Sequence, residues 1–288
     1  MPYLYLVISV FGVASLSVFG AFYNRKNGEK AGASTLYTLV LIATVSCLWA
    51  IMFLIEGEYN WKVLPYSLGF AIGYVACLIA NVNALKTGPV VLTALMMQLS
   101  LIGVTIWGFF FWGSPFTLLV AVGLVLIVLA LWLCLYTKKK EENKITWRWI
   151  LWASAMFLGN CVCSIFQRTQ QVKFGGKFGN FTMMWAMLFA LVVCFALYLK
   201  SDKSETKEIL KKSWQFPVLS GVFNGVLNLC VILLATSPLS PSLVYPVIAV
   251  GGIAVNTVFS AFVFKEKMRW WQWLGVLVGA VAVGILSI

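Results

Sequence analysis

Residues 115–137 read PFTLLVAVGLVLIVLALWLCLYT, without a single charged side chain. A stretch of this length can cross the hydrocarbon core of a bilayer as one helix, which takes about 20 apolar residues. Helices and closed barrels are the only structures that satisfy their backbone hydrogen bonds inside lipid. Because apolar and polar residues do not alternate along 115–137, as they would in a barrel strand, the stretch predicts a transmembrane helix.

Nine further apolar runs have the same character and are separated by short polar connectors. The 288 residues are 61% hydrophobic and 10% charged, whereas a soluble protein carries about 25% charged residues. We therefore predict an all-α integral membrane protein with ten transmembrane helices, and we expect the connector at 202–212 to be a solvated loop. The nine runs cover residues 3–23, 34–55, 63–85, 88–112, 149–167, 180–200, 215–236, 242–264 and 270–288.

The chain lacks the side chains on which most enzymes depend. It contains no His, and its nine Asp and Glu lie in or beside the predicted connectors. A zinc site, a Ser-His-Asp triad or a buried pair of carboxylates therefore cannot be assembled inside the membrane. The seven cysteines fall within apolar runs, where cysteine behaves as a small hydrophobic residue. We predict no enzyme activity, no metal and no cofactor.

The net charge of +12 does not indicate a nucleic-acid partner, because the Lys and Arg are scattered over the connectors. Membrane lipids with anionic headgroups are the expected partners. Most Lys and Arg fall in the connectors that follow the first, third, fifth, seventh and ninth runs. Since positively charged connectors stay on the cytoplasmic side, both termini are expected outside the plasma (cytoplasmic) membrane.

The two halves of the chain show a weak internal repeat. Residues 24–25, 30 and 32 match residues 167–168, 173 and 175 at one spacing, and residues 105, 110, 123 and 130 match 257, 262, 275 and 282 at another. We divide the chain into two five-helix repeats, 1–137 and 138–288. Because five crossings are an odd number, the copies lie in opposite orientations. Transporters with such inverted repeats bind substrate between the halves and expose it to each side in turn.

The stretch FKEKMRWWQWLGVLVG at 264–279 joins the last two runs. Its short turn with Glu266, followed by Gln272 and two glycines four residues apart, resembles the end of the second repeat in EamA-type members of the drug/metabolite transporter superfamily. Together with ten helices and two repeats, the resemblance covers essentially the whole chain and implies a secondary transporter. The first half departs from this pattern, because residues 112–115 replace the expected turn with Glu. The resemblance also implies that both termini lie inside, as in most ten-helix members of the family. This orientation is opposite to the one that the Lys and Arg count predicts.

Polar side chains inside the predicted spans are the candidates for substrate binding, because each needs a partner or water in lipid. Such amides either line a cavity or only hydrogen-bond neighbouring helices to one another. The resemblance favours a cavity, since the superfamily's cavity is similarly placed among helices one, three, four, six, eight and nine. Deep aromatic rings could stack on a substrate or only pack. The candidates are Asn81, Asn83, Gln98, Trp107, Asn160, Asn224, Asn228, Tyr245 and Asn256.

Three basic residues at the ends of predicted helices are candidates for gating. Arg25 and Arg168 occupy equivalent places in the two repeats, so inversion puts them on opposite sides of the membrane. Each could instead bind the last carbonyl groups of its own helix. Lys86 could attract an anionic substrate or extend its charged end to the membrane surface.

The predicted spans hold no buried acidic residue, whereas small multidrug members of the superfamily use a membrane-buried Glu. We therefore expect a transporter of small neutral or zwitterionic solutes, such as amino acids, that works by alternating access. An aromatic content of 15% leaves a multidrug or quaternary-ammonium exporter as the alternative. A membrane enzyme would need acidic or His clusters, and a scaffold protein has no use for inverted repeats. A monomer is compatible with the sequence, and so is an oligomer.

Overall fold

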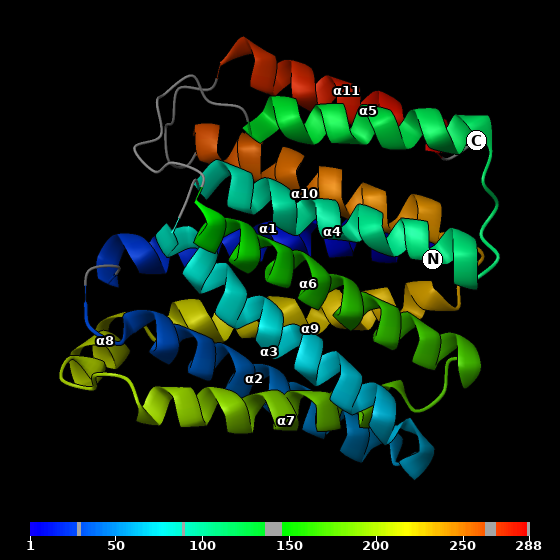
Figure 1. Ribbon diagram of the computed structural model, residues 1–288. Coiled ribbons are helices and arrows are strands. Elements are labelled where there is room, and N and C mark those ends of the chain that lie inside the picture. Colours follow the sequence, from blue (N-terminus) through cyan, green and yellow to red (C-terminus); the bar gives the residue numbers. More distant parts are fainter. Residues whose placement is uncertain (28–29, 88–89, 136–145, 263–268, 287–288) are drawn as a thin grey trace.

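A computed structural model describes residues 1–27, 30–87, 90–135, 146–262 and 269–286. Within these ranges the chain forms helices and no strand, and the long helices lie side by side in one bundle (Figure 1). The short elements are the 3-10 helix η1 (Trp61–Val63) and the helix α8 (Thr206–Ser213). The long helices are α1 (Pro2–Asn27), α2 (Ala33–Glu56), α3 (Leu64–Thr87), α4 (Val90–Phe111), α5 (Leu118–Leu135), α6 (Trp147–Lys173), α7 (Gly179–Leu199), α9 (Gln215–Ala235), α10 (Pro241–Phe262) and α11 (Trp270–Leu286).

Seven of these helices are long and apolar enough to cross a membrane, counting only the described residues: α1, α2, α3, α6, α7, α9 and α10. The apolar segments in α4, α5 and α11 are shorter, at Met96–Phe111, Leu118–Leu133 and Trp270–Leu286. The predicted all-α membrane class is therefore confirmed. The number of crossings, ten, stays a prediction.

Helix packing relates the first half of the chain to the second. The helix α1 packs on α9 and α10, and α6 packs in the same way on α3 and α4. The pairs α2–α7, α4–α10 and α5–α11 join equivalent helices of the two halves. In Figure 1, α1 begins at the end of the bundle where both chain termini lie, and α6 ends there. This is the packing expected of two inverted repeats, but their predicted boundary at 137 and 138 lies outside the described residues.

The end of the bundle that holds both termini is called the terminal end below, and the opposite end is called the α8 end. At the α8 end, residues 206–213 form a helix of two turns instead of the solvated loop that we expected. Its Ile209 is buried, while Glu208 contacts Lys30 and Lys212 at 3.0 Å each. Hydrogen bonds from these two lysines lower the pKa of the Glu208 carboxyl below its ordinary value. One or two amphipathic turns were the alternative that the sequence left open here, and a solvated loop was favoured because charged residues dominate the segment.

The helix α6 also extends beyond its predicted end at residue 167 and continues to Lys173. Its last two turns carry Gln167, Arg168, Gln170 and Gln171, all of which are buried. We ended the run at these residues because polar side chains are costly in lipid. In the folded protein other helices cover them, so the helix continues.

A pair of glycines sets the close packing between α3 and α6. A methyl group added at Gly159 would lie 2.7 Å from the carbonyl oxygen of Gly73, and one added at Gly73 would lie 2.7 Å from the carbonyl oxygen of Gly159. Small residues are enriched where membrane helices approach closely, because packing rather than hydrophobic burial drives their association. The two backbones therefore touch at a point that no larger residue fits.

We predict that Gly159→Ala lowers the melting temperature of the detergent-purified protein. The added methyl group must push α3 and α6 apart, and overpacking of this kind costs about 1–3 kcal/mol. The matched control is Gly284→Ala, since a methyl group there meets nothing within 4 Å and Ala favours a helix over Gly by about 1 kcal/mol. Equal melting temperatures for the two variants would contradict the close contact.

Candidate substrate site and gate

A chain of hydrogen-bonded amides joins α6 to α9 inside the bundle. Gln167 Nε2 donates to Asn228 Oδ1 at 3.2 Å, and Asn228 Nδ2 donates to Asn224 Oδ1 at 3.1 Å. The hydroxyl of Tyr74, on α3, pairs with the Asn224 side chain. Gln167 and Asn224 are buried, while Asn228 is half-buried. These four residues, called the amide chain below, offer both donors and acceptors but carry no formal charge.

A second amide lies on the same side of α6. Asn160 precedes Gln167 by seven residues, which places both side chains on one face of the helix. Asn160 Nδ2 donates to Ser100 Oγ, on α4, at 2.6 Å. Both Asn160 and Asn224 lie near the middle of their helices. Uncharged polar groups therefore extend from the middle of the bundle toward the terminal end.

The other predicted substrate-binding residues do not join this group. Asn83 Nδ2 donates to the carbonyl oxygen of Ile79 in its own helix at 2.8 Å. Asn81 and Gln98 are half-buried on α3 and α4. Asn256 on α10 buries its Oδ1 without a hydrogen-bond partner among the described residues. Trp107 is 37% exposed and stacks on Phe111 at 3.9 Å between ring centroids, so it faces outward.

The gating candidates differ from one another in the structure. Arg168 is only 7% exposed, and its guanidinium lies 5.3 Å from the ring centroid of Trp112. It also pairs with the hydroxyl of Tyr245, which is 2% exposed. Arg25, its equivalent in the first repeat, is exposed, and the side chain of Lys86 lies outside the described residues. The structure thus joins Arg168 to an aromatic cluster inside the bundle, whereas Arg25 lies at the surface.

The contacts of Arg168 bring three parts of the chain together at the terminal end. Trp112 directly follows α4, Arg168 belongs to the last turns of α6, and Tyr245 lies in the second turn of α10. A cation over an aromatic face is attracted by the ring electrons, and more strongly where water is excluded. The trio of Arg168, Trp112 and Tyr245, called the arginine cluster below, holds α4, α6 and α10 together at this end.

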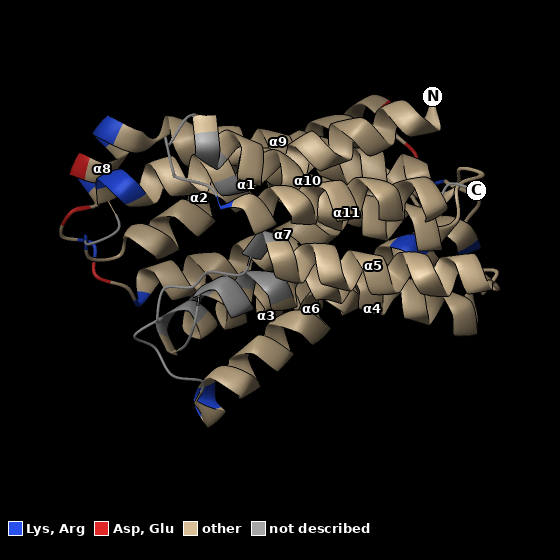
Figure 2. Ribbon diagram, turned by 90° about the horizontal axis from the view of Figure 1, so that it is seen from above, with Lys and Arg blue, Asp and Glu red and all other residues tan. Residues whose placement is uncertain are grey.

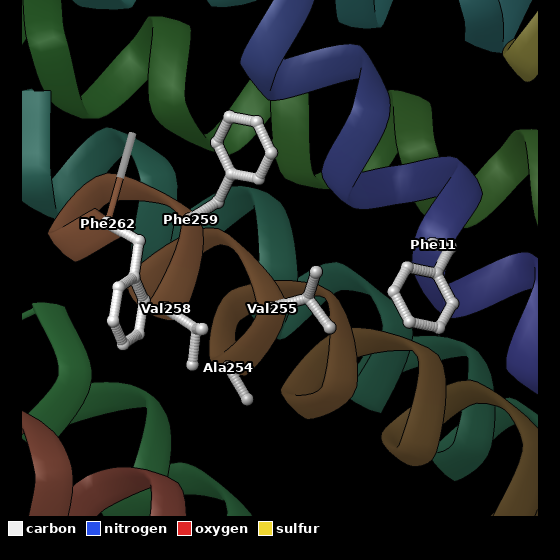
Figure 3. Close-up of a pocket in the computed structure, with 6 residues that line it drawn as sticks. All are labelled: Phe11, Ala254, Val255, Val258, Phe259 and Phe262. Carbon is white, nitrogen blue, oxygen red and sulfur yellow. The ribbon is translucent and has the colours of Figure 1, made fainter. Parts of the chain in front are cut away.

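A separate pocket of about 400 Å³ lies between α1 and α10. Its lining consists of hydrocarbon side chains alone, as Figure 3 shows: Phe11, Ala254, Val255, Val258, Phe259 and Phe262. Such a lining can hold an acyl chain or another lipophilic group, but it cannot orient a polar solute. We therefore place the candidate site for polar solutes at the amide chain.

Four members of these groups were not among the predicted site residues: Gln167, Ser100, Trp112 and Tyr74. Gln167 was taken as the end of a run and Trp112 as the edge of a connector. The seven-residue spacing from Asn160 to Gln167 could have revealed the shared face. For Trp112 the sequence held no such signal, because its partner Arg168 is remote in the chain.

A bundle of apolar helices around buried amides defines an integral membrane protein with a polar interior. Residues 147–288, which begin at the first residue of α6, match the EamA-like transporter family. The second half of the chain therefore matches a family of membrane transporters. The resemblance of residues 264–279 to the superfamily is thereby confirmed.

Two further likenesses agree with this assignment. The chain is 27% identical over 162 residues to an uncharacterized protein of Haemophilus influenzae, an alignment that covers 54% of this chain and 52% of that protein. The chain thus spans about half the length of this relative. A solved crystal structure of a protein superposes with a TM-score of 0.76 and 10% identity, covering 99% of this chain and 95% of that one. This second likeness shows the fold alone.

We predict that Gln167 and Asn228 are energetically coupled. Replacing either residue by Leu removes the hydrogen bond between them, so the double variant loses less stability than the sum of the two single variants. Hydrogen bonds between membrane helices give coupling energies of about 0.6 kcal/mol, and up to about 1.7 kcal/mol. Unfolding of the four proteins in detergent measures this coupling.

The matched control pair is Gln167→Leu with Thr38→Val, because the Thr38 hydroxyl donates to the carbonyl oxygen of Ser34 within its own helix at 3.0 Å. Additive losses are expected for that pair. Additive losses for Gln167 and Asn228 would show that the two amides do not form a unit.

Proposed function

We propose that this protein is a secondary transporter that moves neutral or zwitterionic solutes, such as amino acids, by alternating access. The observation that carries the proposal is the amide chain, which provides uncharged donors and acceptors inside an apolar bundle. Intramembrane polar groups are costly in lipid and commonly mark a substrate path. Amide oxygens and the Tyr74 ring suit the ammonium group and side chain of a small zwitterion.

The arginine cluster supports alternating access. It joins α4, α6 and α10 at the terminal end, so these contacts must separate if the amide chain is to open toward that side. Because the two halves pack in matching ways, they could exchange packing arrangements and open the opposite end instead. We therefore assign Arg168 to a gate at the terminal end.

Charge supports an orientation with the α8 end in the cytoplasm. Figure 2 shows Lys and Arg gathered around α8. Among the residues in and near this helix, Lys203, Lys207, Lys211 and Lys212 are exposed. Connectors rich in Lys and Arg stay on the cytoplasmic side. In the plasma membrane, this orientation would place both termini outside.

A multidrug or quaternary-ammonium exporter remains the second candidate. The pocket between α1 and α10 favours it, because a lipophilic group fits a hydrocarbon lining. The amide chain is the argument against it, since a purely lipophilic cation has no use for so many hydrogen-bonding groups.

Thermal unfolding of the detergent-purified protein against amino acids, nucleosides, sugars and lipophilic cations separates the two candidates. A ligand that binds only the folded state raises the melting temperature by mass action. We predict stabilisation by a compact set of amino acids, and uptake of the same set by proteoliposomes. Asn228→Leu should abolish both effects, whereas Gly284→Ala should retain them. Stabilisation by lipophilic cations alone would establish the exporter instead.

A further inference from the structure

Arg168 is a buried cation whose hydrogen-bonding capacity is not used up. Its side chain is only 7% exposed, and its Nε has no hydrogen-bond partner among the described residues. Its contacts are aromatic, with the ring of Trp112 at 5.3 Å and the hydroxyl of Tyr245. A hydroxyl and a ring face weaken the cost of burying the charge, but neither neutralises it.

No acidic side chain among the described residues forms an ion pair with Arg168. The described acidic residues are Glu56, Glu58, Asp202, Glu205 and Glu208, and Glu208 pairs with Lys30 and Lys212. A guanidinium cannot lose its charge by deprotonation in a protein. Counting only the described residues, the arginine cluster thus holds one positive charge without an acidic partner, and an anionic ligand would neutralise it.

We propose that Arg168 binds the carboxylate of the transported solute. A planar guanidinium matches a carboxylate in shape and donates two parallel hydrogen bonds to it. One cation balances one carboxylate, whereas a phosphate dianion would leave a negative charge. This inference rests on the proposed function and narrows the substrate class to solutes that carry a carboxylate, including amino acids.

The amide chain is well placed to receive the rest of such a solute. It begins at Gln167, the residue that precedes Arg168 on α6, and its Asn228 is half-buried rather than enclosed. A carboxylate that takes the donors of Arg168 would also compete with Tyr245 and Trp112. Binding would thereby weaken the contacts that hold α4, α6 and α10 together, which would couple the solute to the gate.

The test compares carboxylates with the corresponding carboxamides, in which this one group carries no charge. Melting temperatures of the detergent-purified protein are measured with leucine, phenylalanine, glutamine and threonine, and with the carboxamide of each. Lactate and benzoate serve as carboxylates without an ammonium group. We expect the wild type to be stabilised by one or more of the acids and not by the matching amides. Arg168→Gln should weaken acid binding about tenfold to a hundredfold, as expected for a lost charge-assisted hydrogen bond.

The control variant is Lys173→Gln, which removes an exposed cation from the same helix and should keep the preference for acids. If Arg168→Gln does not fold, Arg168→Lys carries the test. Its ammonium cannot reproduce the paired donors, so the Kd for the acids should rise about tenfold. An unchanged Kd in Arg168→Lys, or a preference that persists in Arg168→Gln, would overturn the proposal.

The remaining outcomes distinguish failure of the proposed carboxylate site from failure of the proposed transport function. Equal stabilisation by acids and amides, or stabilisation by sugars or nucleosides alone, would refute the carboxylate site while leaving solute transport intact. The absence of a shift from any solute in the panel, together with no uptake by proteoliposomes, would refute both. A lipid phosphate is tested in nanodiscs with and without phosphatidylglycerol. Stabilisation of the wild type but not Arg168→Gln by that lipid would assign the site to a headgroup and overturn the proposal.

Discussion

Inside lipid, a polar group without a hydrogen-bond partner is costly in free energy, and the rest of this structure depends on that constraint. The backbone meets it by forming helices over most of the described part of the chain. The side chains meet it in two ways. Asn83 and Thr38 donate to carbonyl oxygens of their own helices, so these hydrogen bonds do not join one helix to another. Gln167 on α6 instead donates to Asn228 on α9, and Asn228 in turn donates to Asn224 of its own helix.

Amides that bond between helices also specify which helices meet. The bond from Asn160 to Ser100 fixes α6 against α4, and the amide chain connects α6 with α9. The helices α6 and α3 meet in a different way. Gly73 and Gly159 lie against each other and allow the two backbones to approach closely. Packing is thus tight on one side of α6 and polar on another. A helix with these two unlike faces can hold a rigid partner while presenting hydrogen-bonding groups to a solute.

The matching of helix pairs between the halves gives the proposed transport cycle a physical basis. The helix α6 packs on α3 and α4, and α1 packs in the same way on α9 and α10. The match is not carried to the level of side chains, because Arg168 is buried in an aromatic cluster while Arg25 is exposed. Two similar halves with unlike ends could pass between two arrangements that differ in energy. A ligand that prefers one of them then shifts the balance.

Much of the fold could be predicted from the sequence, because hydrophobic runs directly report which segments cross lipid. The faces through which helices meet are harder to predict. Each run is apolar on every side of its helix, so the sequence does not mark the side that contacts another helix. The four-residue spacing of Asn224 and Asn228 places both side chains on one helix face, which is a local signal in the sequence. Gln167 was missed because its partner lies 61 residues away along the chain. Trp107 looked like a deep residue and faces outward, whereas Trp112, on the edge of a connector, covers the buried arginine.

Alternating access requires that the terminal end and the α8 end open in alternation. Electron-spin distance measurements test it most directly, on a cysteine-free protein in nanodiscs. One label pair, at Phe116 and Lys177, spans the terminal end, and another, at Lys26 and Arg148, spans the α8 end. We expect two populations of the label-to-label distance at each end. A bound solute should lengthen the distance at one end and shorten the distance at the other. A single population at both ends, unchanged by every solute that stabilises the protein, would contradict it.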